Sequence, residues 1–171
     1  MRRQITQAET RAVIEAARTK VPGIAIRTTM LVGFPGETEE EFQELCDFVA
    51  DMKFDRVGVF QYSHEEDTSA HDMKDDVPAE LKAERANRVM EIQQQISLEK
   101  NEAKIGQTLK VLFDRKEGGY FVGRTEADSA EVDNEVLVDA KNNYVRIGDF
   151  ADIKIIDAIE YDLYGEVVAG A

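Results

Sequence analysis

The 171-residue sequence has a single cysteine, three prolines and no tryptophan. With Cys46 alone an internal disulfide is impossible, and neither an iron–sulfur cluster nor a zinc site held by several thiolates can be built from this chain by itself. Cys46 stands between Leu45 and Phe48 in a helical pattern, so we expect it to be a small buried hydrophobic residue.

Long hydrophobic runs are also absent. No apolar stretch approaches the length that crosses a bilayer, and residues 1–6 lead into mixed polar sequence rather than an apolar signal core. We therefore predict a cytoplasmic protein with no membrane partner.

Basic residues are few, because 21 Lys and Arg stand against 35 Asp and Glu, which gives a net charge of −14 at pH 7. Proteins that bind nucleic acids usually present a basic face to the phosphates, so this balance disfavours RNA binding and favours a basic partner. An acid excess that serves only solubility is the alternative, and it requires no partner.

The first part of the sequence alternates helix and strand signals. Capping boxes, in which a glutamate follows a threonine by three residues, begin at Thr6 and Thr38. We expect helices over 6–20 and 38–53, and strands over 24–32 and 56–62. A strand, a helix and a second strand within about forty residues predict a right-handed βαβ unit with parallel strands.

The second part has a different pattern. A long helix is predicted after Val77-Pro78, and it ends near Ile105 before Gly106. Short β-like runs separated by turn residues follow at 108–113, 119–124, 135–138, 145–146 and 151–156. Five such runs predict a small closed antiparallel barrel of the OB type. The predicted fold class is therefore α/β followed by all-β, with domains at 1–105 and 106–171.

Polar residues directly follow the second predicted strand, in the run Tyr62-Ser63-His64-Glu65-Glu66-Asp67-Thr68. The carboxyl ends of strands are where α/β folds usually build their sites. The side chains from His64 to Asp67 suit a metal site or an acid–base cluster. Adjacent residues of a loop diverge, however, so a solvated run is the favoured interpretation.

Two features accompany the first predicted strand. The turn Gly33-Phe34-Pro35-Gly36 ends it, and glycine there would allow the backbone to approach a ligand, with a tight strand-to-helix turn as the equal alternative. Arg27 falls inside this strand, which we expect to be buried, so its charge should face a cavity or pair with an acid.

Only two clear strands are predicted before residue 106, which leaves the edges of a parallel sheet uncovered. The chain therefore reads as the C-terminal part of a larger protein.

Several motifs in order resemble the radical S-adenosylmethionine methylthiotransferases: Gly33 to Thr38, Phe54 to Ser63 with Glu65 and Thr68, a long helix, and Gly123-Arg124-Thr125. The run 62–68 and residues 128–133 are similar to the RimO branch, which acts on a ribosomal protein, whereas the tRNA-modifying MiaB branch typically has proline in this loop. The resemblance implies a partial (β/α) barrel followed by a TRAM domain. It also implies methylthiolation of an aspartate in the twelfth protein of the small ribosomal subunit.

The resemblance further implies S-adenosylmethionine and two [4Fe–4S] clusters in the full-length enzyme. The C-x3-C-x2-C ligands are not in this chain, so we expect it to hold no metal, to contribute no catalytic residue and to be inactive alone. The residues implied at the S-adenosylmethionine pocket are Arg27, Leu31, Gly33, Gln61, Tyr62 and Ser63, although a structural ion pair is an equal role for Arg27. The residues implied at the protein substrate are His64, Glu65, Glu66 and Asp67.

The implied TRAM domain would recruit the basic ribosomal protein. Residues 107–171 contain 7 basic and 14 acidic residues, which suits a basic protein better than RNA. Gly123-Arg124-Thr125 either shapes a barrel turn or marks a partner-binding face, and we favour the turn. A tRNA methylthiotransferase fragment and a stand-alone protein-binding module are the alternative functions.

Overall fold

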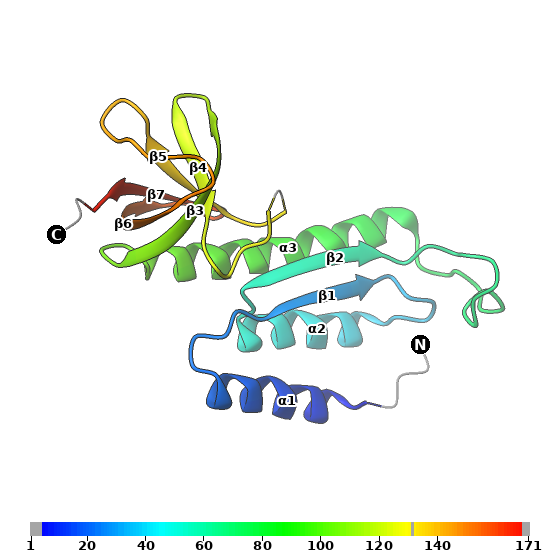
Figure 1. Cartoon of the computed structure of the whole chain (residues 1–171). Helices are drawn as coiled ribbons and strands as arrows, with labels where there is room; N and C mark the ends of the chain where they lie inside the picture. The colour runs from blue at the N-terminus through cyan, green and yellow to red at the C-terminus, as the bar shows by residue number, and fades with distance from the viewer. Residues whose placement is uncertain (1–4, 131, 169–171) are drawn as a thin grey trace. The chain divides into compact units, whose positions relative to one another are not determined.

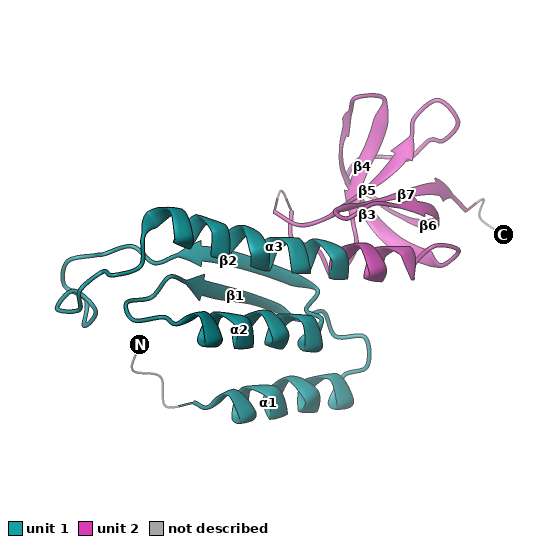
Figure 2. Ribbon diagram, turned by 180° about the vertical axis from the view of Figure 1, so that it is seen from behind, with its two compact units in different colours: residues 1–96 teal, residues 97–171 magenta. Residues whose placement is uncertain are grey.

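The computed structural model describes residues 5–130 and 132–168. The chain divides into two compact units, residues 1–96 and 97–171 (Figure 2). The division falls inside the longest helix, α3 (Ala79–Glu102), and each unit has its own cluster of buried hydrophobic side chains. No helix of the described residues is both long and apolar enough to cross a membrane.

The first unit, here called the α/β unit, contains α1 (Gln7–Lys20), β1 (Arg27–Val32), α2 (Glu39–Met52), β2 (Arg56–Gln61) and most of α3 (Figure 1). Both predicted capping boxes are confirmed. The hydroxyls of Thr6 and Thr38 accept from the N–H of Glu9 and Glu41, whose carboxylates accept from the threonine N–H groups in return. Local sequence therefore sets where α1 and α2 begin.

β1 and β2 pair in parallel, which confirms the predicted strand–helix–strand arrangement, and Leu31 lies beside Phe60. Side chains alternate between the two faces of a sheet. Met30 and Val32 are buried on one face, in a cluster to which all three helices contribute. On the other face Phe60 is 63% exposed, and neither strand has another strand neighbour among the described residues. The helices cover one face of this sheet and leave the other open.

The second unit is a closed barrel made of β3 (Thr108–Glu117), β4 (Tyr120–Arg124), β5 (Glu135–Asp139), β6 (Phe150–Ala158) and β7 (Asp162–Val167). Around the barrel the strands follow the order β3-β4-β5-β7-β6. Its centre is filled by inward-facing side chains from every strand, among them Val111, Phe121, Val138, Ile153 and Leu163.

The strand number agrees with the prediction, but the expectation that every pair is antiparallel is wrong. β5 and β7 run parallel, with Val136 beside Leu163, while the remaining pairs are antiparallel. Strand directions can alternate around a closed ring only when the number of strands is even. A ring of five must therefore contain a parallel pair.

One of the five strand positions is also wrong. Residues 145–146 lie in the loop between β5 and β6, where Val145 is buried, and the fifth strand is β7. Gly165 lies inside β7, and a Cβ there would be 2.3 Å from Ile153 Cγ2. Close packing requires glycine at this point, and glycine weakens the sequence signal of a strand.

Candidate functional site

The turn and the polar loop lie at the same end of the α/β unit. Residues 33–36 follow β1 and residues 62–76 follow β2, at the ends to which both parallel strands point (Figure 1). The N–H of Tyr62 donates to Val32 O at 2.8 Å, so the loop starts beside the turn. The rings of Phe34 and Tyr62 meet edge to face, with centroids 5.3 Å apart. We call this region the strand-end site.

Acidic side chains fix the turn. Gly33 has a φ of +73°, in the region that favours glycine, and its N–H donates to Glu37 Oε1 at 2.9 Å. The N–H of Gly36 donates to Asp76 Oδ1 at 2.8 Å. Both N–H groups therefore already have carboxylate partners from the protein.

Lys82 of α3 connects the turn with the loop. It is 6% exposed, and its Nζ lies 2.7 Å from each carboxylate oxygen of Asp75 and 3.3 Å from Tyr62 O. A Cβ on Gly33 would be 2.3 Å from Lys82 Cγ. The space that a side chain at Gly33 would fill is therefore occupied by the stem of Lys82.

Arg85, one turn further along α3, supports the same region. Its Nη1 lies 2.7 Å from Glu37 Oε1 and its Nη2 lies 3.1 Å from Glu39 Oε2. The side chains of Arg85 and Glu37 are 4% and 12% exposed, respectively. Because Glu37 also accepts from Gly33, the arginine holds the turn through this carboxylate.

The polar run is exposed along its length, at Ser63, His64, Glu65, Glu66 and Asp67. The Ser63 hydroxyl donates to Glu65 Oε1 at 2.6 Å, and the Thr68 hydroxyl donates to Glu65 O at 2.9 Å. No group of three or more His, Cys, Asp or Glu residues in the described part of the chain could hold a metal ion. The loop thus presents an exposed acidic surface, as the solvated interpretation expected.

The residues implied at the cofactor pocket separate into two kinds. Leu31 lies on the open face of the sheet beside the exposed Phe60, and Gln61 and Ser63 are exposed at the end of β2. Tyr62, by contrast, is 9% exposed and packs within the site. Sequence reasoning missed Phe60, which the alternation of β2 could have placed beside Leu31.

The expectation that Arg27 lies in a buried strand is wrong. β1 begins at Arg27, which is exposed, whereas the strand-end site follows Val32. At about 3.3 Å per residue these ends are roughly 16 Å apart, so Arg27 is not brought together with the other five residues.

Lys82 and Arg85 were also missed as contributors. Arg85 stands between Leu81 and Val89 at intervals of four residues, so it shares their side of the helix. A cation among apolar residues at this spacing was the available signal for a buried ion pair. Nothing local in the sequence indicates that Asp75 pairs with Lys82 or that Asp76 accepts from Gly36. Both aspartates lie in an irregular loop, and Gly36 is 40 residues from Asp76.

Cys46 is buried, 2% exposed, in the core of the α/β unit. Burial raises the pKa of its thiol, which keeps the thiol protonated. The predicted role as a small hydrophobic residue is confirmed, and this cysteine does not fit a cluster ligand.

Known proteins match nearly all of this chain. Residues 105–168 match the TRAM domain family. The ribosomal protein uS12 methylthiotransferase RimO of Cytophaga hutchinsonii is 62% identical over 98% of this chain and 38% of its own length. The proteins of the same name from Flavobacterium johnsoniae and Bacteroides fragilis are 57% and 50% identical, over 97% and 98% of this chain and 38% and 39% of their own lengths.

Over the part that it spans, the chain belongs to the RimO methylthiotransferase family. The resemblance to the RimO branch and the expected TRAM domain are thereby confirmed. The chain spans little more than a third of the length of these RimO relatives.

Proposed function

We propose that this chain is the C-terminal part of a radical S-adenosylmethionine enzyme that methylthiolates an aspartate of ribosomal protein uS12 in the cytoplasm. Residues 1–105 would complete the catalytic barrel, and residues 106–171 would form the TRAM barrel that recruits the substrate. The strand-end site carries this proposal, because a turn and an acidic loop meet there beside an open sheet face, in a chain 62% identical to a uS12 methylthiotransferase.

The residues of the strand-end site fit one wall of an S-adenosylmethionine pocket. Leu31 and Phe60 offer an apolar surface for the adenine ring, and Gln61 and Ser63 offer polar groups next to it. Gly33 and Tyr62 would act indirectly, since Gly33 admits Lys82 and Tyr62 supports the loop. Bound S-adenosylmethionine would supply the radical and the methyl group.

The chain does not fit the two iron–sulfur clusters implied for the parent enzyme. Its only cysteine is buried and protonated, and the described residues contain no other ligand cluster. We therefore expect the chain alone to be inactive. With reductant, S-adenosylmethionine and uS12, mass spectrometry should show no methylthiolated product, whereas the RimO of Cytophaga hutchinsonii should give it. A product from this chain would overturn the assignment of cluster chemistry to another part of the protein.

The exposed acids at 64–67 would meet the incoming basic protein. To test this, binding of purified uS12 and of tRNA to the 171-residue chain is measured at moderate salt. The double variant Glu66→Gln, Asp67→Asn should weaken uS12 binding about fivefold, since exposed charges contribute modestly. The matched variant Glu15→Gln, Glu44→Gln removes two exposed acids from α1 and α2 and should change the affinity for uS12 less than twofold. A preference for tRNA would overturn the assignment.

A further inference from the structure

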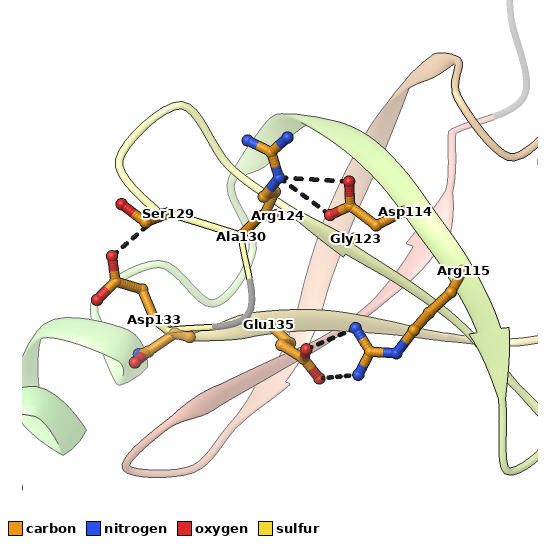
Figure 3. A pocket seen from close by; sticks show the side chains of 9 residues that line it. Asp114, Arg115, Gly123, Arg124, Ser129, Ala130, Asp133 and Glu135 are labelled. Atoms are coloured by element: carbon orange, nitrogen blue, oxygen red, sulfur yellow. Dashed lines mark hydrogen bonds and ion pairs between the residues drawn. The ribbon is translucent and has the colours of Figure 1, made fainter.

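The barrel has a hollow of its own, apart from the strand-end site. It has a volume of about 410 Å³ and is lined by β3, β4, the start of β5 and the loop before β5 (Figure 3). Its charged and amide side chains are those of Asp114, Arg115, Arg124, Asp133, Asn134 and Glu135. We call it the Arg124 hollow.

A β-bulge builds one wall. Phe113 pairs with Gly123 and Arg115 with Val122, so Asp114 is the extra residue of β3. A bulge redirects side chains, and Asp114 here lies against Arg124, with its two carboxylate oxygens 3.0 and 3.3 Å from Arg124 Nε. The bulge thus places an ion pair at the rim of the hollow.

The two arginines of the hollow differ in their hydrogen bonding. Each nitrogen of the Arg115 guanidinium has a partner: its terminal nitrogens meet both carboxylate oxygens of Glu135 at 2.8 and 3.1 Å, and its Nε meets Glu117 at 2.7 Å. These carboxylates raise the pKa of Arg115. Arg124 uses only Nε, and within the described residues its Nη1 and Nη2 make no hydrogen bond. Figure 3 shows these two nitrogens directed away from Asp114.

The lining, just before β5, contains another donor without an acceptor. Asn134 is 6% exposed, and its Nδ2 has no hydrogen-bond partner in the described part of the chain. A buried amide donor left unpaired is unfavourable, because no hydrogen bond offsets its loss of hydration. Because Asn134 Nδ2 is itself buried, the donors that the hollow presents to a ligand are Nη1 and Nη2 of Arg124, next to its carboxylates.

The favoured turn at Thr125 is present, since its hydroxyl bonds Asp128 at 2.5 Å and its carbonyl accepts from the Asp128 N–H. That turn accounts for Thr125 but leaves the terminal nitrogens of Arg124 unexplained.

We propose that the Arg124 hollow binds an extended segment of the basic ribosomal protein, with Arg124 donating to its backbone carbonyl oxygens and the surrounding carboxylates accepting from its lysine or arginine side chains. The inference rests on the proposed function and assigns its recruiting surface. Carboxylates outnumber guanidinium groups three to two in the hollow, and acids outnumber bases 14 to 7 in residues 107–171. This balance opposes a phosphate ligand, whereas a neutral carbonyl suits Arg124.

The test relies on a substitution for which long-range electrostatics and a direct hydrogen bond predict opposite changes in affinity. Removing a positive charge should strengthen attraction to a basic partner if only long-range electrostatics act. The variant Arg124→Ala should instead weaken uS12 binding about tenfold, because a guanidinium hydrogen-bonded in an interface is a frequent hot spot. Arg124→Lys keeps the charge but not the planar fork, and we expect it to recover only part of the affinity.

The matched control is Arg146→Ala, which removes the same charge from an arginine of the same unit whose side chain is 79% exposed. It should leave uS12 binding unchanged or slightly tighter. Equal effects of Arg124→Ala and Arg146→Ala, or tRNA binding that depends on Arg124, would overturn the assignment of the hollow while the proposed function stands. If the unsubstituted chain does not bind uS12, both the proposed recruitment of uS12 and the assignment of the Arg124 hollow fail.

Discussion

The two units differ in how deeply the ion-paired cations at their candidate sites are buried. In the barrel every strand has a neighbour on both sides, and the ion-paired side chains of Arg115 and Arg124 are 43% and 32% exposed. In the α/β unit a sheet face is open, yet Lys82 and Arg85 have side chains only 7% and 4% exposed. Both units have an apolar core, but the α/β unit also uses buried ion pairs to hold the turn and the loop of the strand-end site.

The largest expected effect concerns the two partners of Arg85. Glu37→Ala removes the carboxylate that is 12% exposed and leaves a buried guanidinium poorly paired. We expect this variant to lose about 3 kcal/mol of unfolding free energy, since breaking a buried pair from one side is strongly destabilising. Urea unfolding followed by hydrogen exchange would report each unit separately, and the loss should be confined to the α/β unit.

Glu39→Ala is the natural control, because Glu39 contacts the same arginine with a side chain that is 71% exposed. Surface pairs contribute about 0–1 kcal/mol, so little stability should be lost. Similar losses in both variants would show that burial does not distinguish these pairs, and the contrast between the two units would fail.

A smaller difference in stability is expected between alanine substitutions at two glycines that lie in strands. A Cβ on Gly123 of the barrel would lie 2.6 Å from Leu112 O and from Val111 Cγ1, whereas a Cβ on Gly58 of the open sheet meets only Thr29 Oγ1, at 3.8 Å. Gly123→Ala should therefore cost about 1–3 kcal/mol through overpacking. Gly58→Ala should be neutral or stabilise by about 0.5 kcal/mol, because alanine loses less entropy on folding.

Thermal unfolding of the two alanine variants checks this. Destabilisation by Gly58→Ala would mean that the sheet face is covered by contacts beyond those described for this chain. Tolerance of Gly123→Ala would mean that the bulge between Phe113 and Arg115 can relax.

The sequence predicted the features that depend on neighbouring residues. It did not predict those that depend on closing the barrel or on contacts between residues distant along the chain. The capping boxes at Thr6 and Thr38 set their helices correctly because a cap needs only the next turn. The parallel pair β5–β7 follows from closing an odd ring, which no single strand signals. The position of Lys82 against Gly33 joins residues 49 apart, so spacing on the helix could indicate a buried cation but not its target.

The smallest expected effect tests whether Lys82 orders the acidic loop. Lys82→Met keeps an unbranched apolar stem against Gly33 but removes the charge that bonds Asp75 and Tyr62 O. Amides in residues 63–76 should then exchange about tenfold faster, which corresponds to roughly 1.4 kcal/mol of local stability, a typical contribution of charged hydrogen bonds. Exchange in α1 and α2 should not change, because their capping boxes and packing do not involve this lysine.

Lys74→Met provides the comparison, since it removes an equal charge from the exposed loop itself. If net charge alone controlled the loop, both variants would raise its exchange equally. We expect less than a twofold change for Lys74→Met, because an exposed lysine contributes little to local stability. A rise restricted to Lys82→Met would show that a buried cation, rather than the acidity of the run 64–67, holds the loop beside the turn.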